Sequence, residues 1–245
     1  MFDKPVFVFT TDIDWASEHC IQSLLGDMRD RGVVPTAFAT HTSEALSRAE
    51  AAGEVKIGLH PNFLPQSSHG ETREEVIEHI FNLFPKARCF RSHAMVDDSH
   101  ISMAMKARDI LYDSNLCLYL QPGLVPLHHW TGIPRFPMFW ADDIHWRRDG
   151  DFNFAPYEDL FFSPGLKIIG VHPFMYTLNL SDHDTYTAMK PNYRTLTKPQ
   201  AEDLRSPGPG AQTFLHELID AVQAKGYEFQ TLDQVYDAYP KEGIV

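Results

Sequence analysis

Two aspartates lie two residues apart at the end of an apolar run near the N-terminus, and histidines follow further along the chain. Asp12 and Asp14 come at the end of VFVFTTDID. Residues two apart on a β-strand point to the same side. Carboxylates held together repel each other unless a cation or a proton lies between them. With His60 and His69 nearby, a divalent metal ion is the expected neutralising group, because one carboxylate and two imidazoles leave coordination positions open for catalysis.

Polar residues of the same kinds end three other predicted strands. His60 ends VKIGLH, Arg91 and His93 end RCFRSH, and His172 ends LKIIGVH. Any one of these residues alone is weak evidence, since an aspartate after a strand often caps a helix. The carboxyl ends of parallel strands share one face, however, and active sites are built there. Their recurrence therefore predicts a single site at that face.

Short β-rich runs alternate with helical stretches over most of the chain, which implies parallel strands joined by right-handed crossovers. Apolar spacing and β-rich composition predict strands over 6–12, 35–41, 55–60, 88–93, 110–115, 166–173 and 227–231. Helical spacing and capping residues predict helices over 17–31, 43–53, 71–84, 211–225, a short segment after Ser99 and the end of the chain. The fold class is therefore α/β.

Two proline-rich regions interrupt this alternation. They cover residues 121–160 and 177–210. We interpret both as long loops or lids on one domain that spans 1–245, because no internal repeat or second strand–helix series is evident.

The charge of the chain restricts its partners. Its formal net charge is −12 over 245 residues. Such a surface argues against neutralising nucleic-acid phosphates and against docking on an anionic membrane. No stretch approaches the roughly 20 apolar residues of a membrane span. We therefore expect neither a nucleic-acid partner nor membrane insertion, and the oligomeric state stays open.

The cysteines and the N-terminus favour a cytoplasmic location. Cys20, Cys89 and Cys117 have no CxxC spacing, and an odd number without a framework suits a reducing compartment. The N-terminal run MFDKPVFVFTTD is apolar for only a few residues before it reaches carboxylates. It is typical of a first strand and not of a signal peptide.

Five segments resemble, in order, the motifs of the polysaccharide deacetylases, the carbohydrate esterases that include NodB-type chitooligosaccharide deacetylases. TTDIDWA resembles the opening T-F-D-D motif, and VKIGLHPNF with SSHGETREEVIEHI resembles the second, E-I-G-N-H-T-x-S-H. CFRSHAM, FWADDIHW and IIGVHPF resemble the third, fourth and fifth. The resemblance runs from about residue 6 to 239, and its first, second and fifth motifs are specific. It implies a single-domain (β/α) barrel, distorted and seven-stranded.

The chain departs from the family's pattern at three places. Ile13 separates aspartates that are adjacent in the family, and His60 and His69 are nine residues apart, further than in the motif. The loop 61–68 must therefore fold back to bring the two histidines together. The Pro-Pro-Tyr of the third motif is replaced by Ser92, His93 and Ala94. These departures predict a divergent branch.

The resemblance implies a role for each matching residue. Asp14, His60 and His69 would hold a divalent metal ion, most often zinc in this family. Asp12 would be the general base, oriented by Arg91 through a charge-assisted pair. The two aspartates point the same way on a strand, so geometry alone does not distinguish them. The family's order puts the base first and the ligand second, and Asp14 lies closer to the strand end and the following loop, where the ion should lie beside His60.

The second half of the chain would supply the remaining groups. His172 would protonate the departing amine as general acid. The backbone N–H of Ala94 could take the place of the tyrosine amide in the family's oxyanion site. Asp142 or Asp143 is a candidate for tuning His172, and Trp146 for lining the acetyl pocket. His93 has three interpretations: a structural hydrogen bonder, which we rank first, an added ligand, or a substrate contact.

Three functions fit these residues. The first is metal-dependent removal of an acetyl group from an N- or O-acetylated sugar or polysaccharide precursor, so that a carbohydrate is the expected partner. The second is hydrolysis of a linear or cyclic non-acetyl amide on the same scaffold, which the altered third motif favours. The third is a non-catalytic carbohydrate-binding relative, against which the presence of both Asp12 and His172 argues.

Overall fold

The computed structural model describes residues 2–148 and 150–240, and residues 1, 149 and 241–245 of the predicted domain and loops lie outside the described residues. The strands are β1 (Pro5–Asp12), β2 (Thr36–Ala39), β3 (Lys56–Leu59), β4 (Cys89–Phe90), β5 (Tyr112–Asp113), β6 (Leu127–His128), β7 (Pro134–Arg135), β8 (Met138–Ala141), β9 (Gly165–Val171) and β10 (Phe229–Gln230). They form one sheet in the order β6-β7-β5-β4-β3-β2-β1-β9-β8, with β10 beside β1. Only the β6–β7 pair is antiparallel among these described strands.

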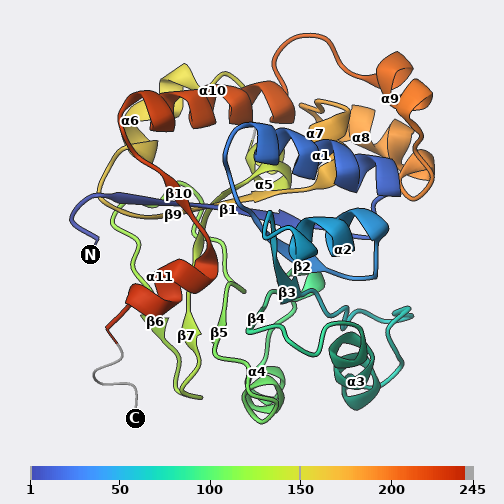
Figure 1. The fold of residues 1–245 in the computed structure, drawn as a ribbon, viewed down its shortest axis with the longest axis vertical. Coiled ribbons are helices and arrows are strands. Elements are labelled where there is room, and N and C mark those ends of the chain that lie inside the picture. The colour runs from blue at the N-terminus through green and yellow to red at the C-terminus, as the bar shows by residue number, and fades with distance from the viewer. Residues whose placement is uncertain (1, 149, 241–245) are drawn as a thin grey trace.

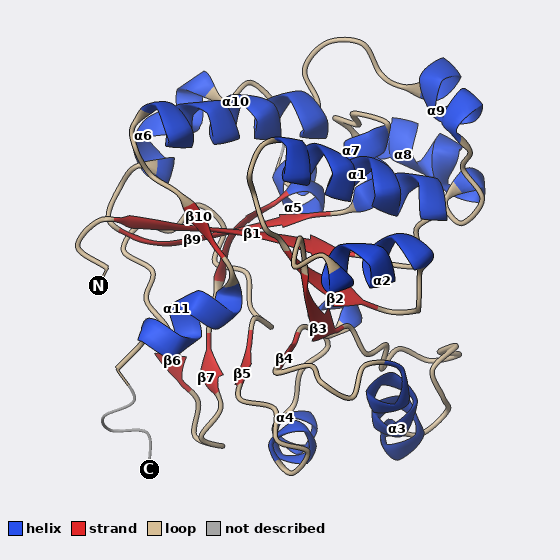
Figure 2. Ribbon diagram, viewed as in Figure 1, coloured by secondary structure: helices blue, strands red, loops and turns tan. Residues whose placement is uncertain are grey.

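Helices cover the outside of this sheet (Figure 2). They are α1 (Glu18–Asp30), α2 (Glu44–Ala51), α3 (Arg73–Leu83), α4 (Ser99–Lys106), α5 (Asp142–Arg147), α6 (Glu158–Phe161), α7 (Pro173–Thr177), α8 (His183–Met189), α9 (Lys198–Leu204), α10 (Ala211–Ala224) and α11 (Leu232–Ala238). Three 3₁₀ turns complete them: η1 (His93–Met95), η2 (Ala155–Tyr157) and η3 (Lys190–Asn192). Figure 1 shows α10, α1 and α2 along one side of β9, β1 and β2, and α3 and α4 beside β3 to β5.

The first strand is the centre of the fold. All eight residues of β1 are buried, and the strand pairs with both β2 and β9. A strand covered on both faces has no polar side to show, which explains its nearly continuous apolar sequence. Its C-terminal residue, Asp12, is therefore carried out of the core at the face where parallel strands end.

The two ends of the curled sheet meet through the segment that follows β5. The backbone N–H of Leu118 donates to Met138 O at 2.9 Å, and that of Leu120 donates to Phe139 O at 2.8 Å. These bonds place residues 116–120 beside β8. Seven parallel strands, β1–β5, β8 and β9, follow one another around this ring in the described part of the chain. The predicted (β/α) barrel is confirmed, as a curled and mostly parallel sheet with surrounding helices.

The region 121–160 contributes more to the core than the loop predicted there. It contains β8, a buried strand of the barrel, as well as β6, β7, α5 and α6. Trp140 of β8 is fully buried and stacks on Phe214 of α10, with ring centroids 4.8 Å apart. The prolines and tryptophans of this region hid a strand of only four residues, which is too short to show a clear period.

The region 177–210 forms short helices, α8 and α9, joined by irregular backbone, and its residues 186–195 line a cavity together with Asp14 and His93. It is tied to the loop after β1: Ser17 N donates to Tyr193 O at 3.1 Å, and Ser17 Oγ donates to Leu196 O at 2.8 Å. The segment thus covers the end of the barrel where the predicted site residues lie. No helix in the described chain has the length and apolar character needed to cross a membrane.

Candidate active site

A carboxylate and two imidazoles meet above the ends of β1, β3 and β4. Asp14 Oδ1 lies 3.0 Å from His60 Nε2 and 2.8 Å from His93 Nδ1. One possible ligand atom from each of the three side chains lies within 4.8 Å of the others. His60 directly follows β3, and His93 opens the turn η1 after β4. Strand ends therefore deliver the group, as expected for a site in a parallel α/β barrel.

Unusual backbone conformations help to form this group. Asp14 and Trp15 have φ values of 46° and 58°, and Ala94 and Met95 have values of 53° and 52°. Non-glycine residues rarely adopt positive φ, and such residues often lie at functional sites. The turn at Asp14 explains how a carboxylate separated from Asp12 by Ile13 still faces the strand ends.

His69, the third ligand predicted from the resemblance, does not join this group. Its ring packs on Trp15 and His79, with centroid distances of 5.5 and 4.9 Å, and its Nδ1 accepts a hydrogen bond from Asn62 N at 3.2 Å. Burial and the charge of His79 lower its pKa to about 4. The loop 61–68 folds back, but it leads His69 to Trp15. The structure instead brings His93 to Asp14. This placement favours the interpretation of His93 as an added ligand over the structural role that we ranked first.

Asp12 is held by a buried arginine. Arg91 Nη1 donates to Asp12 Oδ1 at 2.6 Å and to Thr10 Oγ1 at 3.0 Å. Its other nitrogens donate to the backbone and hydroxyl oxygens of Ser114, and its guanidinium lies 4.2 Å from the centre of the Phe38 ring. A fully buried arginine with this many partners has one orientation, so it fixes the Asp12 carboxylate at the cavity.

A third imidazole, that of His172, lies beside Asp14. His172 follows β9, and its Nδ1 lies 2.7 Å from Asp142 Oδ1, while its backbone N–H donates to Asp142 Oδ2 at 2.8 Å. His172 Nε2 is directed toward Asp14, at 3.5 Å from Oδ2. Because a carboxylate only accepts, Nδ1 carries the proton shared with Asp142. Of the two aspartates proposed to tune His172, Asp142 is the one in contact.

The electrostatics of the two groups differ. Burial alone would raise the pKa of Asp14, but hydrogen bonds from His60 and His93 and the charges of His60 and His172 lower it well below its usual range. Burial alone would lower the pKa of His172, but Asp142 by charge and hydrogen bond, with Asp143 and Asp14, raises it well above its usual value. Asp14 is thus kept as a carboxylate, and His172 as an imidazolium.

These residues line one cavity of about 340 Å³. Its wall includes Asp12, Asp14, His60, Ser92, His93, Ala94, Met95, Met138, Ala141, Asp143, Ile144, Arg147, Gly170 and His172. The pKa of Asp143 is raised, mainly because the side chain is buried, and the charge of His172 partly offsets this effect. Trp146, expected in the acetyl pocket, is outside this wall and packs on Tyr186 with a centroid distance of 5.0 Å.

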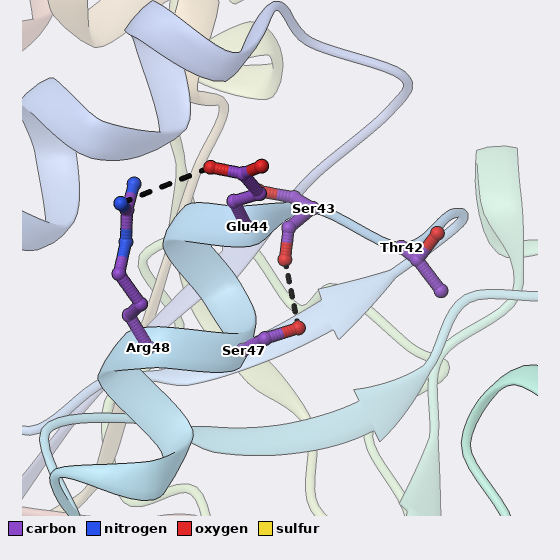
Figure 3. Close-up of a pocket in the computed structure, with 5 residues that line it drawn as sticks. All are labelled: Thr42, Ser43, Glu44, Ser47 and Arg48. Atoms are coloured by element: carbon purple, nitrogen blue, oxygen red, sulfur yellow. Dashed lines mark hydrogen bonds and ion pairs between the residues drawn. The ribbon is translucent and has the colours of Figure 1, made fainter.

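A larger surface cavity, of about 560 Å³, lies at the start of α2, but its side chains do not form a comparable group of carboxylates and imidazoles (Figure 3). Thr42, Ser43, Glu44, Ser47 and Arg48 line it. Their polar groups pair along their own helix: Ser47 Oγ donates to Ser43 O at 2.9 Å, and Arg48 Nη1 lies 3.8 Å from Glu44 Oε2. None of the histidines or strand-end carboxylates reaches it, so size alone does not identify the site.

Comparisons with known proteins identify the scaffold. A family model described as WbmS-like polysaccharide deacetylase matches residues 9–190. The chain is 27% identical to a Bordetella bronchiseptica protein, WbmS, assigned as a polysaccharide deacetylase involved in O-antigen biosynthesis. That match covers 88% of this chain and 90% of WbmS, with a TM-score of 0.80. A search of the curated proteins finds no match.

More distant structures share the fold. The Bc1960 peptidoglycan N-acetylglucosamine deacetylase is 12% identical, with 98% of this chain and 91% of that chain covered and a TM-score of 0.54. A variant of BA3943 from Bacillus anthracis, described as a CE4 family pseudoenzyme with restored activity, is 13% identical, with 97% and 69% covered and a TM-score of 0.50. The family model spans most of the barrel and all five motifs in full, and it shows that this chain belongs to the WbmS-like polysaccharide deacetylase family.

Proposed function

We propose that the protein is a metal-dependent hydrolase that removes an acetyl group from an N- or O-acetylated sugar or polysaccharide precursor. The observation that carries this proposal is the meeting of three units at one cavity: Asp14 with His60 and His93, Asp12 with Arg91, and His172 with Asp142. These units correspond to a metal group, a base and an acid. A cytoplasmic location remains a prediction from the sequence.

Asp14, His60 and His93 fit a divalent metal ion. A carboxylate oxygen and two imidazole nitrogens are ligands that zinc accepts, and three protein ligands leave room for water and substrate. The low pKa of Asp14 keeps the carboxylate in its metal-binding form. When bound, such an ion supplies Lewis acidity toward the acetyl carbonyl and lowers the pKa of water. We propose zinc as the ion on this donor set.

Asp12 is proposed as the general base. Only its Oδ1 is engaged by Arg91, and the side chain lines the cavity next to Asp14. Arg91 makes its other hydrogen bonds to Thr10 and Ser114, so it can hold Asp12 without leaving the core. The carboxylate is therefore oriented to accept a proton from a water molecule at the cavity.

His172 is proposed as the general acid. Asp142 fixes the ring through Nδ1, which leaves Nε2 as the nitrogen that faces the cavity. The raised pKa keeps that nitrogen protonated at neutral pH, so it can donate to the departing amine or alcohol. Ala94, whose N–H was proposed for the oxyanion site, lines the same cavity in a left-handed conformation.

Hydrolysis of a non-acetyl amide is the second candidate. The changed third motif favours it, because His93 and Ala94 reshape the wall where the family has Pro-Tyr. A non-catalytic role has less support, since the base, the acid and a complete donor set are all present at one cavity.

Acetate release tests the proposal. Protein loaded with zinc is incubated with a panel of N- and O-acetylated mono- and oligosaccharides and with cyclic and linear non-acetyl amides, with Asp12→Asn as the matched inactive control. We expect metal-dependent acetate release by the wild type and its loss in the variant. Cleavage of the other amides without acetate release would replace the deacetylase by the second candidate, and no turnover of either class by metal-loaded protein would reject both.

A further inference from the structure

A second cavity, of about 610 Å³, opens beside the first and shares Asp14 and His93 with it. Its remaining wall is Trp15, Tyr186, Lys190, Pro191, Tyr193, Arg194 and Thr195. The two cavities thus meet at the proposed metal group. A substrate whose acetyl group lies in the first cavity would place its next chemical group in the second.

Two cations stand at the outer wall of this second cavity. Lys190 and Arg194 are exposed, and neither forms an ion pair with a residue of the described chain. Each lies near an aromatic ring instead: Arg194 is 5.5 Å from the centre of Trp15, and Lys190 is 5.9 Å from that of Tyr186. Lys190 and Arg194 therefore present two positive charges beside one cavity, in a chain whose formal net charge is −12. The acidic residue in the wall is Asp14, which belongs to the proposed metal group.

The segment that carries these cations is anchored. Ser17, in the loop after β1, binds Tyr193 O and Leu196 O by its N–H and hydroxyl. Tyr193 also stacks on Phe174 of α7, with ring centroids 4.6 Å apart. Because the same loop carries Asp14 and Trp15, the position of Arg194 is fixed relative to the metal group. A surface cation on a free loop would have no such relation to the site.

We propose that this second cavity binds an anionic group of the acetylated sugar. The inference rests on the proposed function and specifies its substrate class. Arginine offers a planar fork and lysine a point charge for phosphate or carboxylate oxygens. The rings of Trp15, Tyr186 and Tyr193 supply flat apolar faces for a sugar or a base. A sugar phosphate, a nucleoside-diphosphate sugar and a uronic acid all carry this negative charge.

The test compares N-acetylated sugars with and without an anionic group. Acetate release is measured with N-acetylglucosamine, its phosphate, uridine-diphosphate N-acetylglucosamine and N-acetylglucosaminuronic acid. We expect the wild type to prefer at least one anionic sugar over the neutral one in kcat/KM, and the preferred member identifies the anion. K190Q/R194Q should reduce that preference by roughly 10–100-fold, the range expected for losing two charged hydrogen-bonding groups. Higher ionic strength should reduce the preference of the wild type as well.

The control removes the same charge elsewhere. Arg29, at the end of α1, and Lys86, after α3, lie where helices return toward the opposite end of the barrel, so R29Q/K86Q should keep the wild-type preference. Equal kcat/KM for neutral and anionic sugars in the wild type, or equal losses in the two double variants, would overturn the inference.

A binding measurement keeps the inference testable if the proposed function fails. If none of the sugars is hydrolysed, calorimetry with N-acetylglucosamine phosphate still probes the cavity. Binding that is lost in K190Q/R194Q and kept in R29Q/K86Q supports the anion site. Absence of binding by the wild type, or equal binding by all three proteins, contradicts it.

Discussion

Two groups of carboxylates and imidazoles lie side by side at the cavity, with His172 Nε2 3.5 Å from Asp14 Oδ2, and they are built differently. In the first, Asp14 lies between His60 and His93. In the second, Asp142 binds both the ring and the backbone of His172. The carboxylate of Asp142 uses both of its oxygens on its neighbour, whereas that of Asp14 has two imidazole nitrogens converging on one oxygen. This difference underlies our proposal that the first group holds a metal ion and that the second holds a proton on His172.

Local backbone explains the difference. Asp14 leaves β1 in a left-handed conformation that turns it toward the ends of β3 and β4. Asp142 opens α5 directly after β8, and β8 pairs with β9, which leads into His172. Asp142, on the strand next to that of His172, orients this histidine through two hydrogen bonds. Asp14, in a turn, instead contacts histidines that follow two different strands.

The largest effect that we expect is the loss of activity on changing Asp12, and it distinguishes the proposed base from the proposed metal group. Asp12→Asn should lower kcat/KM by about 10²–10⁴-fold, the usual contribution of a positioned general base, because an amide cannot accept the water proton. Bound metal should stay at the wild-type level, because Asp14, His60 and His93 remain. Metal analysis and single-turnover rates are measured on the same preparations. If Asp12→Asn loses its metal while Asp14→Asn keeps it, the roles of the two aspartates are the reverse of those proposed.

The second prediction concerns pH. Asp142→Asn should lower the pKa of His172, because it removes the negative charge that counteracts burial. The acid form of His172 is then lost at lower pH, so the alkaline limb of the kcat/KM profile should move to lower pH. We also expect a loss of roughly 10–100-fold at neutral pH, typical when an orienting carboxylate is removed. An unmoved alkaline limb would show that His172 is not the group that titrates there.

The smallest effect should come from the neighbouring aspartate. Asp143 lies 3.9 Å from Arg147 and makes no contact with His172 of the kind that Asp142 makes. Asp143→Asn should change kcat/KM by less than about 5-fold, the range of a weak, partly exposed ion pair. The check is to measure steady-state kcat/KM for Asp143→Asn and Asp142→Asn side by side. A loss as large as that of Asp142→Asn would mean that the second group works as a pair of carboxylates.

Much of this architecture could be predicted from the sequence, because strand ends carry the chemistry. The positions of Asp12 at the end of its strand, and of His60, Arg91 and His172 directly after theirs, follow from apolar runs that stop at a polar residue. The buried strand β8 could not be predicted, since four residues among prolines and aromatics show no period. The sequence placed His93 at a strand end but did not decide between a structural role, an added ligand and a substrate contact. Its only signal was its place two residues after Arg91, on the same predicted strand.

That His93 and not His69 lies beside Asp14 depends on the conformation of the loop 61–68. The number of residues between His60 and His69 does not determine this conformation. Both histidines contact Trp15, with centroid distances of 5.2 and 5.5 Å, but only His93 reaches Asp14. A nine-residue separation allowed His69 to return to His60, and the fold of 61–68 decides that it packs on His79 instead. Family motifs preserve order along the chain, whereas ligand sets depend on which side chain the backbone turns inward.

Metal content of two histidine variants tests the central claim most directly. Wild type, His93→Ala and His69→Ala are purified, dialysed against a zinc buffer and analysed for bound metal, with thermal unfolding as a check that each is folded. We predict about one zinc ion per chain in the wild type and in His69→Ala, and a strong loss of zinc in His93→Ala. A folded His93→Ala protein that keeps its zinc, together with a His69→Ala protein that loses it, would contradict the assignment of Asp14, His60 and His93 as the metal group.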